Sequence, residues 1–409
     1  MKKIPTLFKI DLNKSVFDQE KPLHNRWHPD IPSTVSVKQG DIFKMECIDW
    51  TGGQIKNNDN ARDIKDVDLT RVHYLSGPID IKGSEPGDIL KVEILNVEPH
   101  PQMNWGFTGI FSKNNGGGFL TDLYPHASKA IWDFEGIYTT SRHIPGVRFP
   151  GIIHPGLIGT APSHKLLKEW NERETKLHNT CKTCVPSLAE LPNEKGAWIG
   201  LSENTKNGKK IKKEGSRTIP GRENGGNCDI KNLTKGSTCY FPVFVKGAKL
   251  SMGDIHFSQG DGEISFCGAI ETSGILTLRC SVIKNGMKKL NISNPIFESS
   301  PLEPKFNKYL TFEGFSVDNK GKQYYLDATV SYRMACIRAI EYLTKFGYSP
   351  EQIYILLSTA PVEGRYSGIV DIPNALATLA IPIDIFSINI LPDSKDIKKY
   401  NFKKLPMAK

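Results

Sequence analysis

Short apolar runs separated by turn residues are the feature of this sequence that most limits its fold. Its 409 residues include 36 glycines and 26 prolines, which are spread along the whole chain. Both residues end helices and favour turns, so their even spacing is typical of many short strands joined by loops. The runs at 43–48 and 89–97 fit this pattern, and in the second run apolar and polar residues nearly alternate, as in a half-buried strand. The sequence therefore predicts a β-rich chain.

Helices are expected at only a few places. Ser163 precedes a short helical segment and can cap it. A longer helix is expected from about 327 to 346, because apolar residues recur there every three or four positions and Gly347 follows. Ser349 begins the pattern of a capping box, which starts a second helix running to about 357. Four strands are expected upstream of these helices, at 243–245, 255–257, 264–270 and 275–283.

The length of the chain exceeds what one ordinary core holds, so we expect two closely packed domains. One is a β-rich N-terminal domain at 1–177, and the other, at 224–409, carries most of the candidate site residues. Residues 178–223 are rich in lysine and poor in apolar residues, which indicates a surface insertion. Its Cys181-x-x-Cys184 pair could bind zinc, but no second pair follows at a suitable spacing, so ordinary loop cysteines are favoured.

Composition and charge argue against several classes of protein. Hydrophobic residues make up 38% and charged residues 24%, which is a globular balance. The net charge is +9, and the lysines gather in runs at 209–213, which has no aromatic residue, and at 395–404, which has only Tyr400 and Phe402, so solvated loops are favoured over nucleic-acid binding. The basic start never becomes a signal peptide, and aspartates and prolines interrupt the apolar run at 369–391, so no membrane span is expected. The 8 cysteines do not form a recognisable disulfide framework, and a cytoplasmic location is expected.

The densest group of polar residues lies at 253–263. If this segment is a strand, Asp254, His256 and Ser258 project from one face, because side chains alternate along a strand. A turn at 260–262 would begin a second strand. The same face of that strand would carry Glu263, Ser265, Cys267, Ala269 and Glu271. Such a hairpin would gather carboxylates, a histidine and a thiol on one side, although a solvated hairpin face explains the pattern equally well.

Smaller polar fragments occur elsewhere. The segment 223–231 holds Asn227 and Asp229 behind two glycines that would allow close approach of the backbone. Asp49 follows the expected strand at 43–48, and His73 precedes a turn. Each fragment alone is more often structural than functional. Nucleophile elbows, phosphate loops, HExxH helices and GxGxxG fingerprints are absent from the sequence.

Long stretches of this sequence resemble, in order, the formamidase/acetamidase family, and its longer formamidase branch most closely. The resemblance covers roughly residues 7–390 and departs from the pattern at 178–223. It is carried by PLHNRWHPDIP, ECIDWTGGQIKN, HYLSGPI, EPGDILKVEIL, WGFTGIF, HIPGVRFPGIIHPGLIGTAPS, GGNCDIKNL, KGAKLSMGDIHFSQGDGEISFCGAIE and GIVDIPNALATLAIPIDIF.

The resemblance implies hydrolysis of formamide to formate and ammonia, with weaker activity on acetamide and other short amides. It implies a β-rich α+β fold, with mixed sandwich or barrel layers and a C-terminal α/β element, and a homo-oligomer. It also suggests a divalent ion, zinc or calcium, and no organic cofactor. The expected partner is therefore a small neutral amide, with no nucleic acid or membrane.

Amide hydrolysis needs a polarised carbonyl, an activated water or nucleophile, and a proton for the departing nitrogen. In a metal-assisted hypothesis, Glu263 acts as general base and then as acid. Asn227 or Gln259 holds the substrate. The ion that lowers the pKa of its bound water would be held by Asp49, Asp229, Asp254 and His256.

Two alternatives remain open at this point. In a covalent hypothesis, Cys228 or Cys267 attacks the carbonyl, Glu263 or Glu271 is the base, and Lys231 or Lys249 stabilises charge. In the other, the chain is an inactive metabolite-binding or structural oligomer. Substrate size would be limited by aromatic residues, for which the candidates are Trp105, Phe107 and Trp132.

Overall fold

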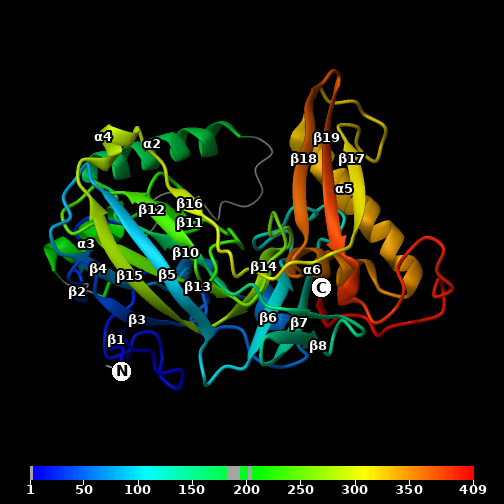
Figure 1. Cartoon of the computed structure of the whole chain (residues 1–409), viewed down its shortest axis with the longest axis horizontal. Coiled ribbons are helices and arrows are strands. Elements are labelled where there is room, and N and C mark those ends of the chain that lie inside the picture. Colours follow the sequence, from blue (N-terminus) through cyan, green and yellow to red (C-terminus); the bar gives the residue numbers. More distant parts are fainter. Residues whose placement is uncertain (1–2, 182–193, 201–204) are drawn as a thin grey trace.

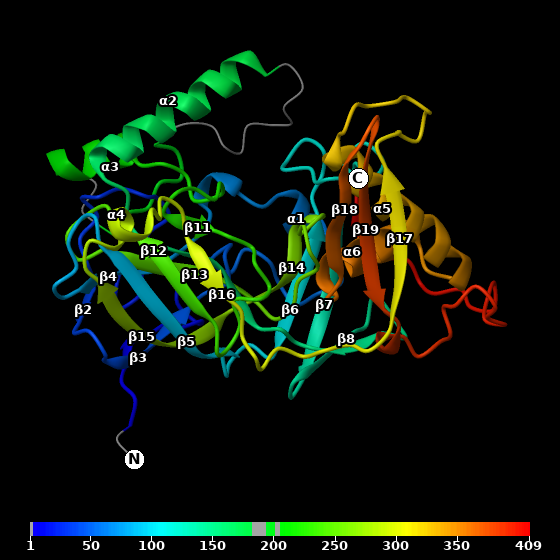
Figure 2. The ribbon, with the colours of Figure 1, turned by 45° about the horizontal axis from the view of Figure 1, so that its top comes forward.

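The computed structural model describes residues 3–181, 194–200 and 205–409, which form three β-sheets and a small number of helices. Two lobes are visible in Figure 1. One lobe contains the six-stranded sheet, and the other contains the three-stranded sheet with α5 and α6. An eleven-stranded sheet connects them, and its strands β14 and β6 lie between the lobes in both views (Figure 2).

The six-stranded sheet forms the main layer of the first lobe. Its longest strands, β15 and β5, pair antiparallel along their whole length. Buried and half-buried residues alternate along the first half of β5, which confirms the pattern predicted at 89–97. In order, the sheet contains β1 (Thr6–Phe8), β3 (Ile42–Cys47), β15 (Gly274–Ile283), β5 (Ile89–Pro99), β12 (Thr238–Pro242) and β16 (Ile296–Glu298).

The eleven-stranded sheet carries the polar residues singled out above. Its centre is the antiparallel pair of β13 and β14, with β10 on the other side of β13. The main path contains β11 (Gly225–Asn227), β10 (His154–Gly159), β13 (Leu250–His256), β14 (Phe266–Thr272), β6 (Trp105–Ile110), β7 (Ala127–Glu135), β8 (Tyr138–Ser141) and β9 (Arg148–Pro150). Beside it lie β2 (Val35–Val37), β4 (Ser76–Ile81) and β20 (Met407–Ala408).

The three-stranded sheet stands in the second lobe, in the order β17 (Tyr309–Phe315), β19 (Asn374–Pro382), β18 (Glu363–Asp371). Helix α5 (Ala328–Leu343) packs against it, and α6 (Pro350–Thr359) is buried behind β14 and β6. Both helices were predicted. Gly347 takes the left-handed conformation that ends the first, and the capping box of Ser349 and Gln352 begins the second.

The remaining helices are short, apart from α2. The expected cap at Ser163 is present, but α2 runs for 17 residues, farther than predicted. None of the helices in the described ranges is both long and apolar enough to cross a membrane. These elements are α1 (Arg62–Lys65), η1 (Leu69–Arg71), α2 (His164–Thr180), α3 (Lys206–Glu214), α4 (Gly286–Leu290), η2 (Thr344–Phe346) and η3 (Ile383–Ile385).

Three local predictions differ from the structure. Residues 243–245 are not a strand, because β12 ends at Pro242 and a turn follows. The strand after the 260–262 turn begins at Phe266, so Glu263 lies in the connection. Residues 216–218 belong to a segment expected on the surface, yet they are buried. Cys181 is disulfide-bonded, and Cys184 lies outside the described residues.

Candidate active site

The polar residues of β13 and β14 face each other in the interior. His256 at the end of β13 pairs with Glu271 on β14, and on its other side it pairs with His154 on β10. His256 is fully buried, and Asp254 and Glu271 are nearly so. A solvated hairpin face is therefore the wrong interpretation of this pattern. Such burial of charged groups is costly unless they bind each other or a ligand.

Two carboxyl groups lie against the same nitrogen of His256. Its Nε2 is 3.2 Å from Asp254 Oδ1 and 3.0 Å from Glu271 Oε2. Gly156 on β10 makes room for this arrangement, because a Cβ at that position would lie 2.3 Å from His256 Cε1 and 2.7 Å from Asp254 Oδ2. A glycine is therefore required where β10 passes the site.

A second pair of carboxyl groups lies beside the first. Asp229 follows β11, Glu263 precedes β14, and a carboxyl oxygen of each lies within 4.8 Å of the other. Both residues have left-handed backbone conformations, with φ of 47° and 44°, which turns of this kind require. We call Asp229, Asp254, His256, Glu263 and Glu271 the His256 cluster. It contains four acidic residues and one basic residue.

This imbalance shifts the ionisation of the whole cluster. Burial alone would raise the pKa of Asp254, but the neighbouring His256 cation lowers it to about 2. Burial would likewise lower the pKa of His256, but Glu271 and Asp254 raise it well above its usual value. Burial raises the pKa of Asp229 to about 7 and that of Glu271 to about 8. Burial and the charge of Asp229 also raise the pKa of Glu263 well above its usual range.

The other ring nitrogen of His256 has fixed partners. His256 Nδ1 lies 3.0 Å from Gln259 Oε1 and 3.3 Å from His154 Nε2. Gln259 is held in turn by donating its Nε2–H to Asp229 O at 2.6 Å. His154 Nδ1 donates to Ile152 O at 2.6 Å, so its Nε2 is an acceptor when the ring is neutral. Burial lowers the pKa of His154 to about 3 and keeps it neutral. The proton on His256 Nδ1 is therefore held in place, and Nε2 is directed at the carboxyl groups.

A cavity of about 210 Å³ opens beside the cluster. Several buried polar atoms at the cluster and along this cavity have no hydrogen-bond partner, namely Asn227 Oδ1, Asp229 Oδ1, His256 Nε2 and Glu271 Oε2. Unpartnered buried atoms of this kind are rare and indicate a ligand. The cavity is lined by Trp50, Val72, His73, Ile219, Asn227, Asp229, Asp254, Glu263, Phe266 and Glu271.

His73 adds a neutral group to the cavity wall. Thr218 Oγ1 accepts from the His73 backbone N–H at 2.7 Å and lies 3.0 Å from Nδ1 of its ring. If the hydroxyl donates to Nδ1, the ring proton is on Nε2, which lies 4.0 Å from Asp254 Oδ2. Burial lowers the pKa of His73 to about 4, so the ring is neutral at neutral pH. His73 can then offer a hydrogen-bond donor to a molecule in the cavity.

Comparison with known proteins identifies the family. The model described as the Acetamidase/Formamidase family matches residues 9–388. The chain belongs to this family. It is 59% identical over 390 residues to a formamidase of Methylophilus methylotrophus, covering 95% of each protein. It is 54% identical over 367 residues to an acetamidase of Mycolicibacterium smegmatis, covering 88% of this chain and 90% of that protein.

A solved structure shows the same fold. The chain matches a gamma lactamase from Delftia acidovorans at a TM-score of 0.96 and 55% sequence identity, covering 99% of both chains. The β-rich fold with a helix-bearing C-terminal region, expected from the resemblance to the acetamidase/formamidase family, is therefore confirmed.

Two groups of residues in the His256 cluster could each hold a metal ion. One is Asp254, His256 and Glu271, all buried, and the other is Asp229, His256 and Glu263; the ligand atoms of each group lie within 4.8 Å of one another. His256 Nε2 and Glu271 Oε2 approach to 3.0 Å, yet neither has a hydrogen-bond partner. Their geometry fits a shared cation, because a histidine ligand commonly donates its other N–H to an oxygen, as Nδ1 does here.

The structure brings together most, but not all, of the residues suggested by the sequence. Asn227, Asp229, Asp254, His256, Gln259 and Glu263 converge on the site. Asp49 lies apart from both groups of ligand atoms: its Oδ1 accepts from Thr51 and its Oδ2 from Gly53 N. Trp105, Phe107 and Trp132 are not among the residues that line the cavity.

The cysteines and lysines of the covalent hypothesis lack the surroundings that this chemistry needs. Burial raises the pKa of both Cys228 and Cys267, to about 12 for Cys228, which disfavours a thiolate. Lys231 Nζ is bound to Asp261 Oδ1 at 2.5 Å and to Val362 O. Lys249 Nζ donates to Pro29 O and Ile31 O. Both lysines are thus committed to partners outside the His256 cluster.

Sequence reasoning missed several contributors to the site, among them His154, Gly156 and Ile219. His154 and Gly156 reach it only through the pairing of β10 with β13. Ile219 lines the cavity although it lies in the segment expected to be a surface insertion. A signal was available for the first two, because a histidine two residues from a glycine in an apolar strand is unusual. Nothing in the sequence shows which strand lies beside it.

Proposed function

We propose that this protein is a formamidase, which hydrolyses formamide to formate and ammonia and acts more weakly on acetamide and other short amides. The observation that carries the proposal is the cavity of about 210 Å³ whose wall holds Asp229, Asp254, Glu263 and Glu271. Formamidase and acetamidase relatives at 59% and 54% identity support the assignment to amide hydrolysis. One methyl group in such a pocket is worth about 1–3 kcal/mol of discrimination, so some activity on acetamide is expected.

Two groups would position the amide. Asn227 Oδ1 is buried without a partner and would accept a hydrogen bond from the substrate NH2 group. His73 Nε2–H would donate to the carbonyl oxygen, on which negative charge develops as water adds. Because His73 is neutral and Asn227 carries no charge, the pair suits an uncharged amide better than a carboxylate product.

The second carboxyl pair would move the protons. Asp229, with a pKa of about 7, is available as a base at neutral pH. Glu263, with its raised pKa, holds a proton. In the proposed reaction, Asp229 takes a proton from the water that attacks the carbonyl carbon, and Glu263 gives its proton to the nitrogen as the C–N bond breaks. Asp229 would then pass the proton that it took from water to the neighbouring Glu263, which restores both groups.

A divalent ion, zinc or calcium, would be held by Asp254, His256 and Glu271. When bound, such an ion polarises the carbonyl oxygen or lowers the pKa of water. Gln259 would orient His256 for this role through its contact with Nδ1. Asp49, with both oxygens bound within its own turn, would act by holding the neighbouring Trp50 at the cavity wall.

We further propose that the protein works in the cytoplasm as a homo-oligomer. Exposed apolar side chains near the tip of the β18–β19 hairpin support an assembly, because Val370 and Ile372 are 74% and 68% exposed. Light scattering measures the number of subunits in the assembly.

The test is ammonia release from formamide, acetamide and propionamide by protein purified without added metal, with and without a chelator. Fast release from formamide, little from propionamide, and loss on chelation support the proposal, provided that metal content and the melting temperature (Tm) fall together. Release that survives chelation but is lost on thiol alkylation would favour Cys228 or Cys267. If zinc-supplied, folded protein releases no ammonia, the formamidase assignment fails and the binding-protein alternative is favoured.

A further inference from the structure

A second chamber lies next to the cavity of the His256 cluster. Its volume is about 450 Å³. Glu263 and Phe266 line both chambers, so these two side chains form the wall between them. The outer chamber is otherwise lined by Gly116, Gly118, Phe119, Gly262, Ile264, Thr329, Tyr332 and Tyr366.

The two chambers differ in chemistry. The inner one carries three further carboxyl groups in addition to Glu263, whereas the other lining residues of the outer one are glycines, aromatic rings, an isoleucine and a threonine. The outer wall is firmly held, because Tyr332 Oη donates to Asp261 O at 2.6 Å and its ring lies 6.1 Å from that of Phe119. An apolar chamber beside a polar one suits an alkyl chain that extends from a reacting amide.

Phe266 adopts an unusual backbone conformation for its size. Its φ is +82°, a region that bulky residues rarely occupy. The surroundings nevertheless hold it there: its N–H donates to Glu263 O at 3.2 Å, and its ring lies 5.0 Å from Phe111. Phe111 in turn contacts Trp50 of the inner wall, with 6.1 Å between ring centroids. The ring of Phe266 is thus fixed in the wall.

We propose that Phe266 is the residue that limits substrate length, by closing the inner cavity against the outer chamber. This inference rests on the proposed function and names its substrate class: linear primary amides short enough to fit in front of Phe266. With the ring removed, the chambers join, and the alkyl chain of butyramide would extend into the apolar outer space. Glu263, the other shared residue, would lie at the reacting nitrogen and so does not serve as a test.

The experiment compares kcat/KM for formamide, acetamide, propionamide and butyramide in wild type and in Phe266→Ala. We expect the butyramide-to-formamide ratio to rise by about 10-fold or more, since each methylene in a pocket contributes on that scale. Phe266→Gly is a second variant, because glycine suits φ +82° and preserves the fold if alanine does not. Phe119→Ala is the matched control, since it enlarges only the outer chamber, and its ratio should stay within about twofold of wild type.

The outcomes separate the two proposals. If wild type releases ammonia but the folded Phe266 variants keep the wild-type ratio, the role of Phe266 is wrong and the formamidase assignment stands. An equal rise in Phe119→Ala would also overturn it, because the limit would then lie in the outer chamber. If wild type hydrolyses none of the four amides, the proposed function fails, and this inference fails with it.

Discussion

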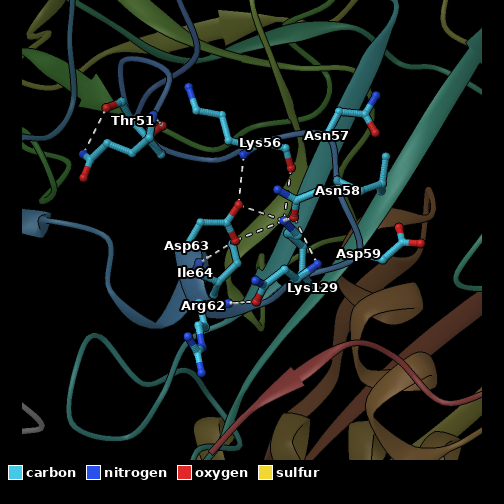
Figure 3. A network of polar contacts seen from close by, with 12 residues as sticks. Thr51, Lys56, Asn57, Asn58, Asp59, Arg62, Asp63, Ile64 and Lys129 are labelled. Atoms are coloured by element: carbon cyan, nitrogen blue, oxygen red, sulfur yellow. Dashed lines mark hydrogen bonds and ion pairs between the residues drawn. The ribbon is translucent and has the colours of Figure 1, made fainter.

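Two buried charged clusters lie on the eleven-stranded sheet, and they differ in how their charges are matched. In one, which we call the Lys129 cluster, Lys129 of β7 meets Asp63, Asn58 and the backbone of Lys56 (Figure 3). Its Nζ is 2.8 Å from Asn58 Oδ1, 3.0 Å from Lys56 O, and 3.0 and 2.8 Å from the two oxygens of Asp63. One ammonium thus faces one carboxylate. In the His256 cluster, four carboxyl groups face one imidazole.

The difference indicates which cluster is structural and which is functional. Lys129 Nζ and both oxygens of Asp63 have hydrogen-bond partners, whereas His256 Nε2, Glu271 Oε2 and Asp229 Oδ1 have none. A matched cluster holds the chain together, here by fixing the loop at 56–63. In an unmatched cluster, the excess of carboxyl groups raises the free energy of the folded state, and a bound substrate or cation can lower it. Four variants or conditions test this contrast.

The largest effect is expected for Glu271→Gln. We expect kcat/KM for formamide to fall by roughly 10²–10⁴-fold, the range for groups that act directly in a reaction. In chelated protein the Tm should stay level or rise, because one of four crowded carboxyl groups is replaced by a neutral amide. Steady-state kinetics and thermal unfolding measure both. Glu135→Gln, an exposed residue on β7 of the same sheet, is the control. If Glu271→Gln keeps its activity but loses stability, the His256 cluster is structural and not functional.

Lys129→Met should have the opposite profile. It leaves the half-buried Asp63 without its cation, and loss of one partner of a buried ion pair costs about 3–5 kcal/mol of unfolding free energy, an upper bound here. The kcat of the folded protein should change little, because the Lys129 cluster does not line the cavity. Urea titration gives the stability, and the double variant with Asp63→Asn should recover part of it. If the folded Lys129→Met protein has lost ammonia release, the contrast between the clusters is wrong.

A smaller loss is expected for Gln259→Leu, which removes the oxygen that faces His256 Nδ1. Changing a residue that orients a metal-ligating histidine typically costs about 10–100-fold in affinity or activity. Less chelator should therefore be needed to inactivate the variant. Gln259→Glu keeps an acceptor toward Nδ1 and should retain more activity. Equal losses in both variants would show that the bond to Asp229 O, which both of them lose, is the important one.

The last test is the pH dependence of stability in chelated protein. The pKa of Glu271 rises from its ordinary value of 4.5 to about 8 on folding. Between these values the folded protein keeps a proton that the unfolded chain has released, so rising pH favours the unfolded chain. Glu271→Gln removes this dependence. The Tm of the variant relative to wild type should therefore grow from about pH 5 to pH 8 and then level off. A constant difference would contradict the raised pKa.

Site residues that are close together in the sequence were predictable, and those far apart in the sequence were not. Asp254 and His256 share a face because they are two residues apart on a strand, which the sequence showed. Glu271 was predicted on the next strand and does face His256. His73, His154 and Asp229 come from other parts of the chain, and strand pairing over more than 20 residues cannot be read from alternation alone. Phe266 was not predicted either, because its left-handed backbone has no sequence signal.

The sequence by itself determined the family, the predominance of short strands, the two C-terminal helices with their caps, and the strand face of Asp254 and His256. These depend on local patterns of apolar spacing and turn residues. Only the tertiary structure decided that these side chains are buried, that four carboxyl groups converge on one histidine, and that Phe266 separates two chambers. Burial and convergence depend on which strands pair. Which strands pair depends on the packing of the whole chain. The positions of the buried carboxyl groups with raised pKa values, and of the polar atoms without hydrogen-bond partners, therefore cannot be read from local sequence patterns.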